Sequence, residues 1–402
     1  MAVGEANFDF HVVPGVRMAS FPCGIKSDGV NDLVMFEFVE GSVTAAVFTK
    51  SLFAAAPVEV GRRHLKQTSP RYFVINSGNA NAATGDEGIA DSLTCCKSLS
   101  QLVGARPEEI IPFSTGVIGE RLPVSRITDA LHNLLPRLGE NNWLEAARGI
   151  MTTDTRPKIV SRQKEILGKK ITITGIAKGS GMIQPNMATM LSYIATDVSL
   201  SQHTLQGMLD QAVNKSFNRI TVDSDTSTND SCMLTATGVS GLCVDEDPES
   251  SVKFYELLEE LMIELAKGLV RDAEGATKFV AVRVINGEEQ KSCLAIAYVI
   301  ANSPLVKTAI FASDANWGRI VMAIGKVEAD IDISKLDIYI GDVRLMANGT
   351  RDPGYVESMG DEAMSTEEIT ITVDLKSGDC EETVWTSDLS HEYVRINAEY
   401  RT

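Results

Sequence analysis

Residues 178–191 contain a threonine in a setting that suits self-cleavage. The segment reads Lys-Gly-Ser-Gly-Met-Ile-Gln-Pro-Asn-Met-Ala-Thr-Met-Leu, and Thr189 follows the small Ala188. Two glycines allow an irregular backbone, and Pro185-Asn186 favours a turn. At such a kink the threonine hydroxyl can attack the preceding carbonyl carbon. Hydrolysis then frees an α-amino group, which serves as the base for the same hydroxyl. Taken alone, however, a glycine-rich segment before a strand is more often an ordinary loop.

A second candidate is the segment 114–119, Ser-Thr-Gly-Val-Ile-Gly. The hydroxyl of Thr115 and the backbone N–H of Gly116 can be aimed at one point, as an oxyanion hole requires. The alternatives are a plain turn before the next helix and a phosphate-binding loop. Neither this segment nor residues 178–191 match the known glycine-rich nucleotide motifs, so the phosphate interpretation is weak.

Three polar clusters, residues 151–158, 223–230 and 271–278, can form solvated turns or line a pocket. The acidic cluster 223–230 could hold the Mg²⁺ of a phosphotransferase. It does not fit a calcium loop, because Thr228 and Leu234 stand where that loop needs Gly and Glu. The five histidines are isolated in the sequence. The absence of an obvious histidine base favours a threonine that supplies its own base.

The composition excludes several classes of protein. The 402 residues carry 37 Lys or Arg against 54 Asp or Glu, a formal charge of −17, which disfavours nucleic-acid binding. The first residues lack a secretory signal, and no apolar run approaches the ~20 residues of a membrane span. Seven scattered cysteines without a Cys-x-x-Cys pair predict reduced thiols rather than disulfides or a zinc site. We therefore expect a cytoplasmic protein that binds no metal, nucleic acid or membrane.

The hydrophobic pattern is mixed α/β throughout and predicts an α+β protein. Strands and helices interleave without a regular strand–helix–strand count, which favours a layered sandwich over a barrel or a doubly wound sheet. Helical periodicity from Ile89 to Gly104 places Cys96 in the core. Strands are expected at 71–76, 171–176, 279–285, 338–340, 343–345, 369–373 and 393–396, and helices at about 126–138 (with Ser125 as N-cap), 205–213, 250–267 and 291–301.

At these motifs the chain resembles a known family, the self-cleaving glutamate N-acetyltransferases (ornithine acetyltransferases) of arginine biosynthesis. The likeness covers essentially the whole chain in order, and many independent motifs agree. They are residues 76–81, 114–119, 151–155, 178–191, the run from 223, 274–278, 313–319 and 397–402.

The resemblance implies an α/β/β/α sandwich like that of aminopeptidases related to N-terminal nucleophile hydrolases, with a smaller additional α/β domain. It implies cleavage between Ala188 and Thr189 into an α chain, 1–188, and a β chain, 189–402. Both chains contribute to one sandwich core, and two α and two β chains assemble. Thr189 is then the nucleophile, and Thr115 and Gly116 form the oxyanion hole. The implied substrate-binding residues are Thr152 (with Thr153 as a close rival), Lys178, Thr189, Glu274, Asn397 and Thr402.

The implied reaction is a ping-pong transfer. Acetyl moves from N2-acetylornithine to Thr189, ornithine leaves, and glutamate takes the acetyl group. The donor has a carboxylate and an ammonium, which Lys178 and Glu274 would orient. No metal or bound cofactor is implied, and use of acetyl-CoA as a co-substrate stays open. Two alternatives remain: an N-terminal nucleophile aminopeptidase or amidohydrolase of the same fold, and an uncleaved small-metabolite binding protein.

Overall fold

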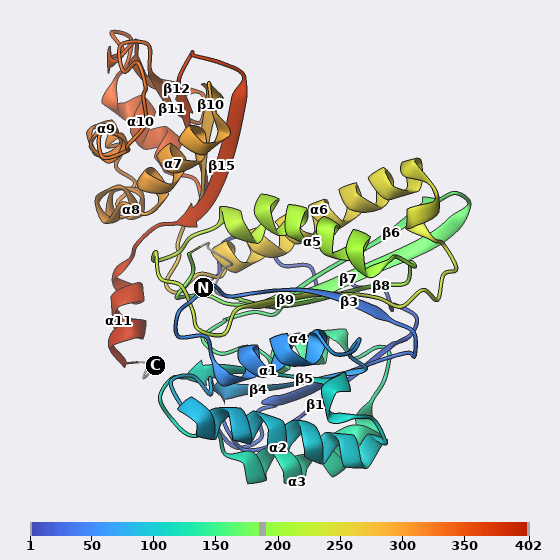
Figure 1. The fold of residues 1–402 in the computed structure, drawn as a ribbon. Helices are drawn as coiled ribbons and strands as arrows, with labels where there is room; N and C mark the ends of the chain where they lie inside the picture. Colours follow the sequence, from blue (N-terminus) through green and yellow to red (C-terminus); the bar gives the residue numbers. More distant parts are fainter. Residues whose placement is uncertain (1, 185–189, 400–402) are drawn as a thin grey trace. The chain divides into compact units, whose positions relative to one another are not determined.

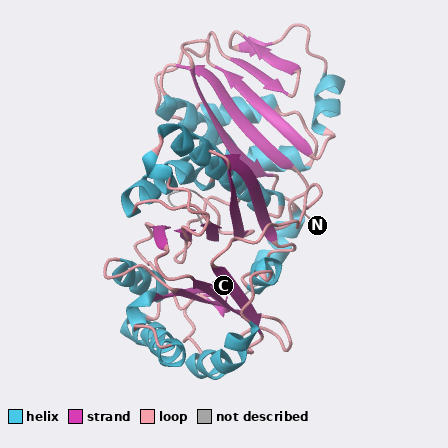
Figure 2. Cartoon of the chain, turned by 90° about the vertical axis from the view of Figure 1, so that its right-hand side faces the viewer, coloured by secondary structure: helices cyan, strands magenta, loops and turns pink. Residues whose placement is uncertain are grey.

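The computed structural model describes residues 2–184 and 190–399, which divide into two compact units. The first, here the sandwich unit, consists of the described parts of Ala6–Asn218 and Thr226–Leu269. The second, here the C-terminal unit, consists of the described parts of Met1–Glu5, Arg219–Asp225 and Val270–Tyr400. Each unit mixes helices and strands (Figures 1 and 2).

Two sheets form the centre of the sandwich unit. The first has the strand order β1-β2-β4-β5, with β4 and β5 parallel and the other neighbours antiparallel. The second has the order β3-β9-β8-β7-β6. The strands are β1 (Val16–Phe21), β2 (Leu33–Phe38), β3 (Val43–Phe48), β4 (Tyr72–Asn79), β5 (Ile110–Val117), β6 (Lys158–Ile166), β7 (Lys169–Lys178), β8 (Leu191–Thr196) and β9 (Ser231–Ala236).

Alternation along the strands divides the apolar residues between two layers. In β2, Phe36 faces the core between the sheets, whereas Met35 faces the outer helices. Aromatic rings join the sheets across the inner core: the centroids of Phe113 and Tyr193 are 5.1 Å apart. Cys96 is fully buried in the outer layer, which confirms its predicted core position.

Helices cover both outer faces, so the unit is the α/β/β/α sandwich that the family resemblance implied (Figure 1). On one side, α2 and α3 pack on the first sheet, and on the other, Leu261 of α6 lies against Gly175 of the second sheet. The helices of this unit are α1 (Ala56–Leu65), α2 (Gly85–Val103), α3 (Val124–Leu134), α4 (Trp143–Gly149), α5 (Gln202–Lys215) and α6 (Pro248–Arg271), with short 3₁₀ turns at Pro107–Glu109, Leu135–Arg137, Phe217–Arg219 and Val244–Glu246.

The C-terminal unit is built on one six-stranded sheet of order β13-β12-β11-β14-β10-β15. Helix α7 packs against β10 and β15, and a separate apolar core fills the space between sheet and helices. The elements are β10 (Phe279–Gly287), α7 (Gln290–Ala301), α8 (Pro304–Phe311), α9 (Trp317–Ile324), β11 (Asp337–Ile340), β12 (Val343–Ala347), β13 (Thr350–Arg351), α10 (Glu357–Met364), β14 (Glu368–Asp374), β15 (Cys380–Ser387) and α11 (His391–Glu399).

Two local predictions are wrong. Residues 393–396 belong to helix α11 and not to a strand. No residue of α11 is buried, so the helix presents no apolar face to a core. The helix begins where the Ser390 hydroxyl accepts the backbone N–H groups of Glu392 and Tyr393. Ser125 does not cap α3, because that helix already begins at Val124, after Pro123.

All seven cysteines lie in the described residues and are free thiols. Within the described ranges, no single helix has both the length and the apolarity to cross a membrane; α7 and α8 reach these values only as a pair bent by 58°.

Candidate active site

Thr115 and Gly116 lie at the end of β5, beside the end of the parallel strand β4. Gly78 is the partner of Gly116 in the sheet register. Gly116 has a φ of 134°, and a Cβ at this position would lie 2.3 Å from the carbonyl carbon of Gly78. Only glycine therefore fits here. The close approach of the two backbones fixes the position of the neighbouring Thr115 side chain.

The ammonium of Lys178, the last residue of β7, donates a hydrogen bond to the hydroxyl oxygen of Thr115 at 3.0 Å. Both side chains are buried. A lysine ammonium has donors only, so Thr115 must be the acceptor in this contact. The hydroxyl proton of Thr115 can therefore point at another oxygen. A buried donor backed by a cation is the arrangement that stabilises a developing oxyanion.

Asp154 connects the segment around Thr152 with the loop that follows β7. Its carboxylate accepts the backbone N–H of Gly179 at 2.7 Å and that of Thr152 at 3.0 Å. It also forms a buried ion pair with Lys158. Burial by itself would raise the pKa of Asp154, but Lys158, Lys178 and these hydrogen bonds hold it below its usual value. Asp154 therefore stays ionised and anchors the loop that follows β7.

The structure distinguishes Thr152 from Thr153. The Thr153 hydroxyl shares a 2.7 Å hydrogen bond with the hydroxyl of Ser180, in the loop after β7. The Thr152 hydroxyl has no hydrogen bond within the described ranges, and its side chain is partly exposed. Thr152 thus has a hydroxyl available for a ligand, and it remains the better candidate of the two.

Ala188, Thr189 and Thr402 lie outside the described residues. The chain is described again from Met190, whose carbonyl accepts the backbone N–H of Ser231 at 3.0 Å. The next residue, Leu191, is the cross-strand partner of Lys178 in the β7–β8 pair. The residue that follows Thr189 in sequence is therefore held one position from the strand partner of Lys178.

Sequence reasoning missed two residues near the Lys178–Thr115 contact, namely Asp230 and Lys26. Asp230 is fully buried, and its carboxyl oxygen Oδ2 has no hydrogen-bond partner among the described residues. Burial raises the pKa of Asp230 well above its usual value, although hydrogen bonds from Ser227 and from the backbone of Met190 oppose the rise. The polar cluster 223–230 gave a signal, but nothing in it singled out Asp230.

Lys26 lies in a loop folded around a buried carboxylate. Asp32 accepts the backbone N–H groups of Cys23, Ile25 and Lys26 at 2.6–2.8 Å. The Lys26 ammonium donates to the carbonyl of Met151, the residue before Thr152. Burial and, to a smaller extent, the nearby charge of Lys178 lower the pKa of Lys26 to about 8, against the opposing effect of Asp32. A single lysine in a loop gave no sequence signal.

The C-terminal unit brings Glu274 and Asn397 together. The Asn397 amide donates to the Glu274 carboxylate at 2.7 Å. Their segments meet because Gly275, with a φ of 68°, lies directly against the start of α11, where the Ser390 hydroxyl donates to its carbonyl at 2.6 Å. The pair offers a carboxylate and an amide carbonyl, which suit a cationic group.

The acidic run 223–230 takes part in hydrogen bonds within the protein. Within the ranges that the structure describes, no three His, Cys, Asp or Glu side chains lie close enough to hold a metal ion. Asp223 instead accepts a hydrogen bond from the hydroxyl of Tyr393 at 3.2 Å, and its other oxygen accepts the backbone N–H of Asp225. In the sandwich unit, the buried ammonium of Lys178 and the hydroxyl of Thr115 form an arrangement that suits acyl chemistry.

The chain is similar over most of its length to known proteins of one family. The model of the ArgJ family matches residues 17–402. The chain is 50% identical over 406 residues to the "Arginine biosynthesis bifunctional protein ArgJ" of Pseudomonas fluorescens, covering 100% of both chains. It is 48% identical to the protein of the same name from Methylococcus capsulatus, covering 97% of this chain and 96% of that one. A crystal structure of the Bacillus halodurans protein of this name is 37% identical, with a TM-score of 0.49, and covers 51% of this chain and 96% of that one.

Proposed function

Because the chain belongs to the ArgJ family, we propose that it transfers the acetyl group of N2-acetylornithine to glutamate through an ester on Thr189. The names of the relatives support a role in arginine biosynthesis. The observation that carries the proposal is the Lys178–Thr115 hydrogen bond of 3.0 Å, with Leu191 as the strand partner of Lys178. This contact supports Thr115 as a charge-supported hydroxyl donor near the strand that follows Thr189.

The first proposed step is cleavage of the Ala188–Thr189 bond. The Thr189 hydroxyl attacks the carbonyl carbon of Ala188, and the acyl group moves from nitrogen to oxygen. Water then hydrolyses the ester and leaves a free α-amino group on Thr189. The products are the α chain 1–188 and the β chain 189–402. Strands of the second sheet come from both chains, since β3, β6 and β7 precede the cut and β8 and β9 follow it.

The second proposed step is acetyl transfer. The α-amino group of Thr189 takes the hydroxyl proton as the oxygen attacks the acetyl carbon of N2-acetylornithine. The Thr115 hydroxyl and the Gly116 N–H donate to the oxyanion that forms. The C–N bond breaks, the proton passes to the departing amine, and ornithine leaves. The amine of glutamate then attacks the acetyl ester by the reverse sequence and releases N-acetylglutamate and the Thr189 hydroxyl.

The charges of the candidate residues match those of the donor, N2-acetylornithine. We assign the α-carboxylate, which donor and acceptor share, to Lys178 and Lys26, with the Thr152 hydroxyl as a further contact. We assign the side-chain ammonium of ornithine to Glu274 and Asn397. Thr402 is retained as a substrate-binding residue on the resemblance alone. The word "bifunctional" in the relatives' names supports a second activity, and we propose acetyl-CoA as the second acetyl donor.

The test is intact mass spectrometry of the purified protein, followed by incubation with N2-acetylornithine. We expect two chains divided before Thr189, a β chain that gains one acetyl group, and loss of that group to glutamate. A single uncut chain that binds acetylornithine unchanged would instead identify a binding protein. Release of free acetate at the same rate with and without glutamate would identify a hydrolase. The Thr189→Ala variant should stay in one chain and be inactive.

Two further expectations accompany this function. We propose a cytoplasmic enzyme, on the basis of seven free cysteines. We also propose an assembly of two α and two β chains, which light scattering of the purified enzyme can measure. A mass equal to one α plus one β chain would contradict that assembly.

A further inference from the structure

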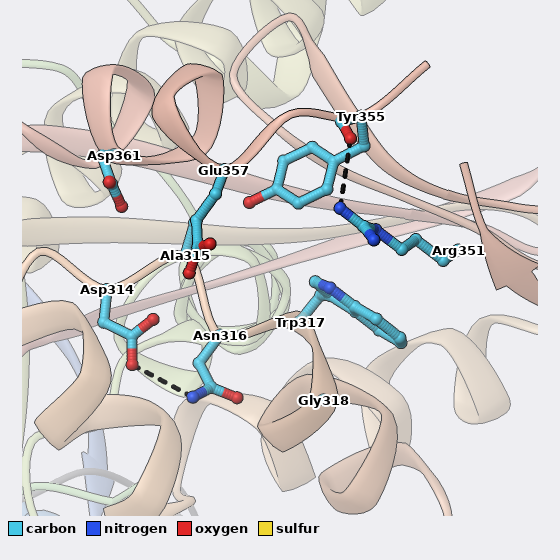
Figure 3. Close-up of a pocket in the computed structure, with 9 residues that line it drawn as sticks. All are labelled: Asp314, Ala315, Asn316, Trp317, Gly318, Arg351, Tyr355, Glu357 and Asp361. Atoms are coloured by element: carbon cyan, nitrogen blue, oxygen red, sulfur yellow. Dashed lines mark hydrogen bonds between the residues drawn. The ribbon is translucent and has the colours of Figure 1, made fainter. Parts of the chain in front are cut away.

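The C-terminal unit contains a pocket that the acetyl-transfer proposal does not use. Its volume is about 410 Å³. Residues 314–318, which lead into α9, form one side, and Arg351, Tyr355 and the first turns of α10 form the other (Figure 3). The sequence singles out residues 313–319 as a motif, but nothing in the acetyl-transfer chemistry assigns it a role.

The pocket is rich in carboxylates. Asp314, Glu357 and Asp361 line it, against the single cation Arg351. The Arg351 guanidinium is already engaged: it donates to the backbone carbonyl of Tyr355 at 3.3 Å and lies 5.6 Å from the centre of the Tyr355 ring. Asp314 accepts one hydrogen bond, from the Asn316 amide at 3.0 Å. The pocket therefore has an excess of negative charge.

The side chain of Tyr355 is a second, independent indication that the pocket is a ligand site. The residue is only 8% exposed, yet its hydroxyl forms no hydrogen bond within the described part of the chain. In Figure 3 the hydroxyl points into the space between the Asp314, Glu357 and Asp361 side chains. Gly360 makes room for it, because a Cβ at that position would lie 2.3 Å from the hydroxyl oxygen. The ring is held in the protein while the hydroxyl faces the cavity without a partner from the described residues, so the hydroxyl is available to a ligand there.

The spacing of the carboxylates selects the class of ligand. Within the described residues, the three carboxylates do not lie close enough together to hold one metal ion. The pocket therefore suits a larger, organic cation. The indole of Trp317 lines the same pocket, and a flat aromatic face attracts ammonium and guanidinium groups. The volume leaves room for an aliphatic chain on that group.

We propose that this pocket binds a small organic cation, an alkylammonium or alkylguanidinium compound, through Asp314, Glu357, Asp361 and the Tyr355 hydroxyl. This binding is separate from acetyl transfer and does not depend on the proposed function. Burial and the nearby Asp361 and Glu357 raise the pKa of Tyr355, so the hydroxyl keeps its proton and can accept from the ligand's N–H through its oxygen.

The test is isothermal titration calorimetry of the full-length protein with 1,4-diaminobutane and with agmatine. Neither probe has the carboxylate that the proposed acetyl-transfer site requires. Agmatine carries a guanidinium and diaminobutane does not, so the comparison separates the two head groups. We expect saturable binding with one site per chain for at least one of them. 1-Butanol and KCl serve as neutral and inorganic controls, and neither should bind in this way.

Three variants locate the site. Asp314→Asn with Asp361→Asn should weaken binding at least about tenfold, because two charges facing the ligand are lost. Tyr355→Phe, which keeps the ring, should weaken it about three- to tenfold. Glu328→Gln with Asp379→Asn removes two exposed carboxylates elsewhere in the same unit and should bind as the wild type does. Thermal melts verify that each variant is folded, and acetyl transfer should be unchanged in all of them.

The proposal is overturned if neither probe saturates the wild-type protein. It is also overturned if KCl competes as well as the organic cations do, or if the pocket and control double variants lose affinity equally. Since acetyl transfer is measured separately, failure of the pocket and failure of the proposed reaction are distinguishable.

Discussion

Lys178 and Thr115 are 63 residues apart in the sequence, yet the lysine ammonium donates to the threonine hydroxyl at 3.0 Å. The contact joins the end of β7 in one sheet to the end of β5 in the other. It therefore links the two layers of the sandwich at the place where the acetyl group is proposed to react. It also leaves the hydroxyl proton of Thr115 free for the substrate oxygen, which makes this residue the first to test.

Replacement of Thr115 by alanine should lower kcat by roughly 10²–10³, as the loss of one oxyanion donor does in other enzymes. KM should change little, because the contact forms mainly in the transition state. Self-cleavage should also slow. Thr115→Ser keeps the hydroxyl and is the matched control. Steady-state kinetics of folded T115A with a wild-type kcat would remove Thr115 from the oxyanion hole.

Replacement of Lys26 by methionine should raise KM for both substrates about 10- to 100-fold with a smaller change in kcat, since a charged hydrogen bond to their shared carboxylate is lost. The pKa of Lys26 is about 8, so its ammonium is present below this pH and is lost above it. In the wild type, KM should therefore rise as the pH passes 8.

The Lys26→Arg variant stays charged over the same range and should show a flatter KM profile. The measurement is KM for N2-acetylornithine as a function of pH in the three proteins. Identical profiles in the wild type and K26R would show that Lys26 does not contact the carboxylate.

We expect Asp230 to affect the α-amino group of Thr189, which acts as the base, and not the self-cleavage of the chain. Burial raises the pKa of Asp230 and so favours its uncharged form in the intact chain, and we expect the neutral variant Asp230→Asn to fold and cut itself. After cleavage, an ammonium appears on Thr189, the residue bonded to Met190, and an ionised Asp230 would stabilise it. In D230N this support is absent, so the α-amino pKa should fall and the acidic limb of the kcat/KM profile should move to lower pH. An unmoved limb would leave Asp230 with a purely structural role.

The layered fold was predictable because the expected strands and helices interleave without the regular strand–helix–strand count of a doubly wound sheet. The pairing of Lys178 with Thr115 was not predictable from spacing, because it depends on how two sheets are stacked. The family resemblance implied only that both residues belong to one site. Lys26 and Asp230 escaped notice because their pKa shifts result from burial by distant segments. Helix α11 was mistaken for a strand because it buries no face of its own.

The docking of α11 can be tested through Gly275. Its φ of 68° is unfavourable for other residues, and a Cβ would lie 2.5 Å from the backbone nitrogen of Tyr393. Gly275→Ala should therefore displace α11 and separate Asn397 from Glu274. If that pair holds the side-chain ammonium of ornithine, KM for N2-acetylornithine should rise about tenfold or more. KM for glutamate, whose side chain ends in a carboxylate instead, should be less affected. Gly241→Ala is the matched control, since Gly241 also has a positive φ, of 67°, but only the end of the Lys169 side chain nearby. Equal increases of KM for both substrates in G275A would show that α11 does not distinguish them.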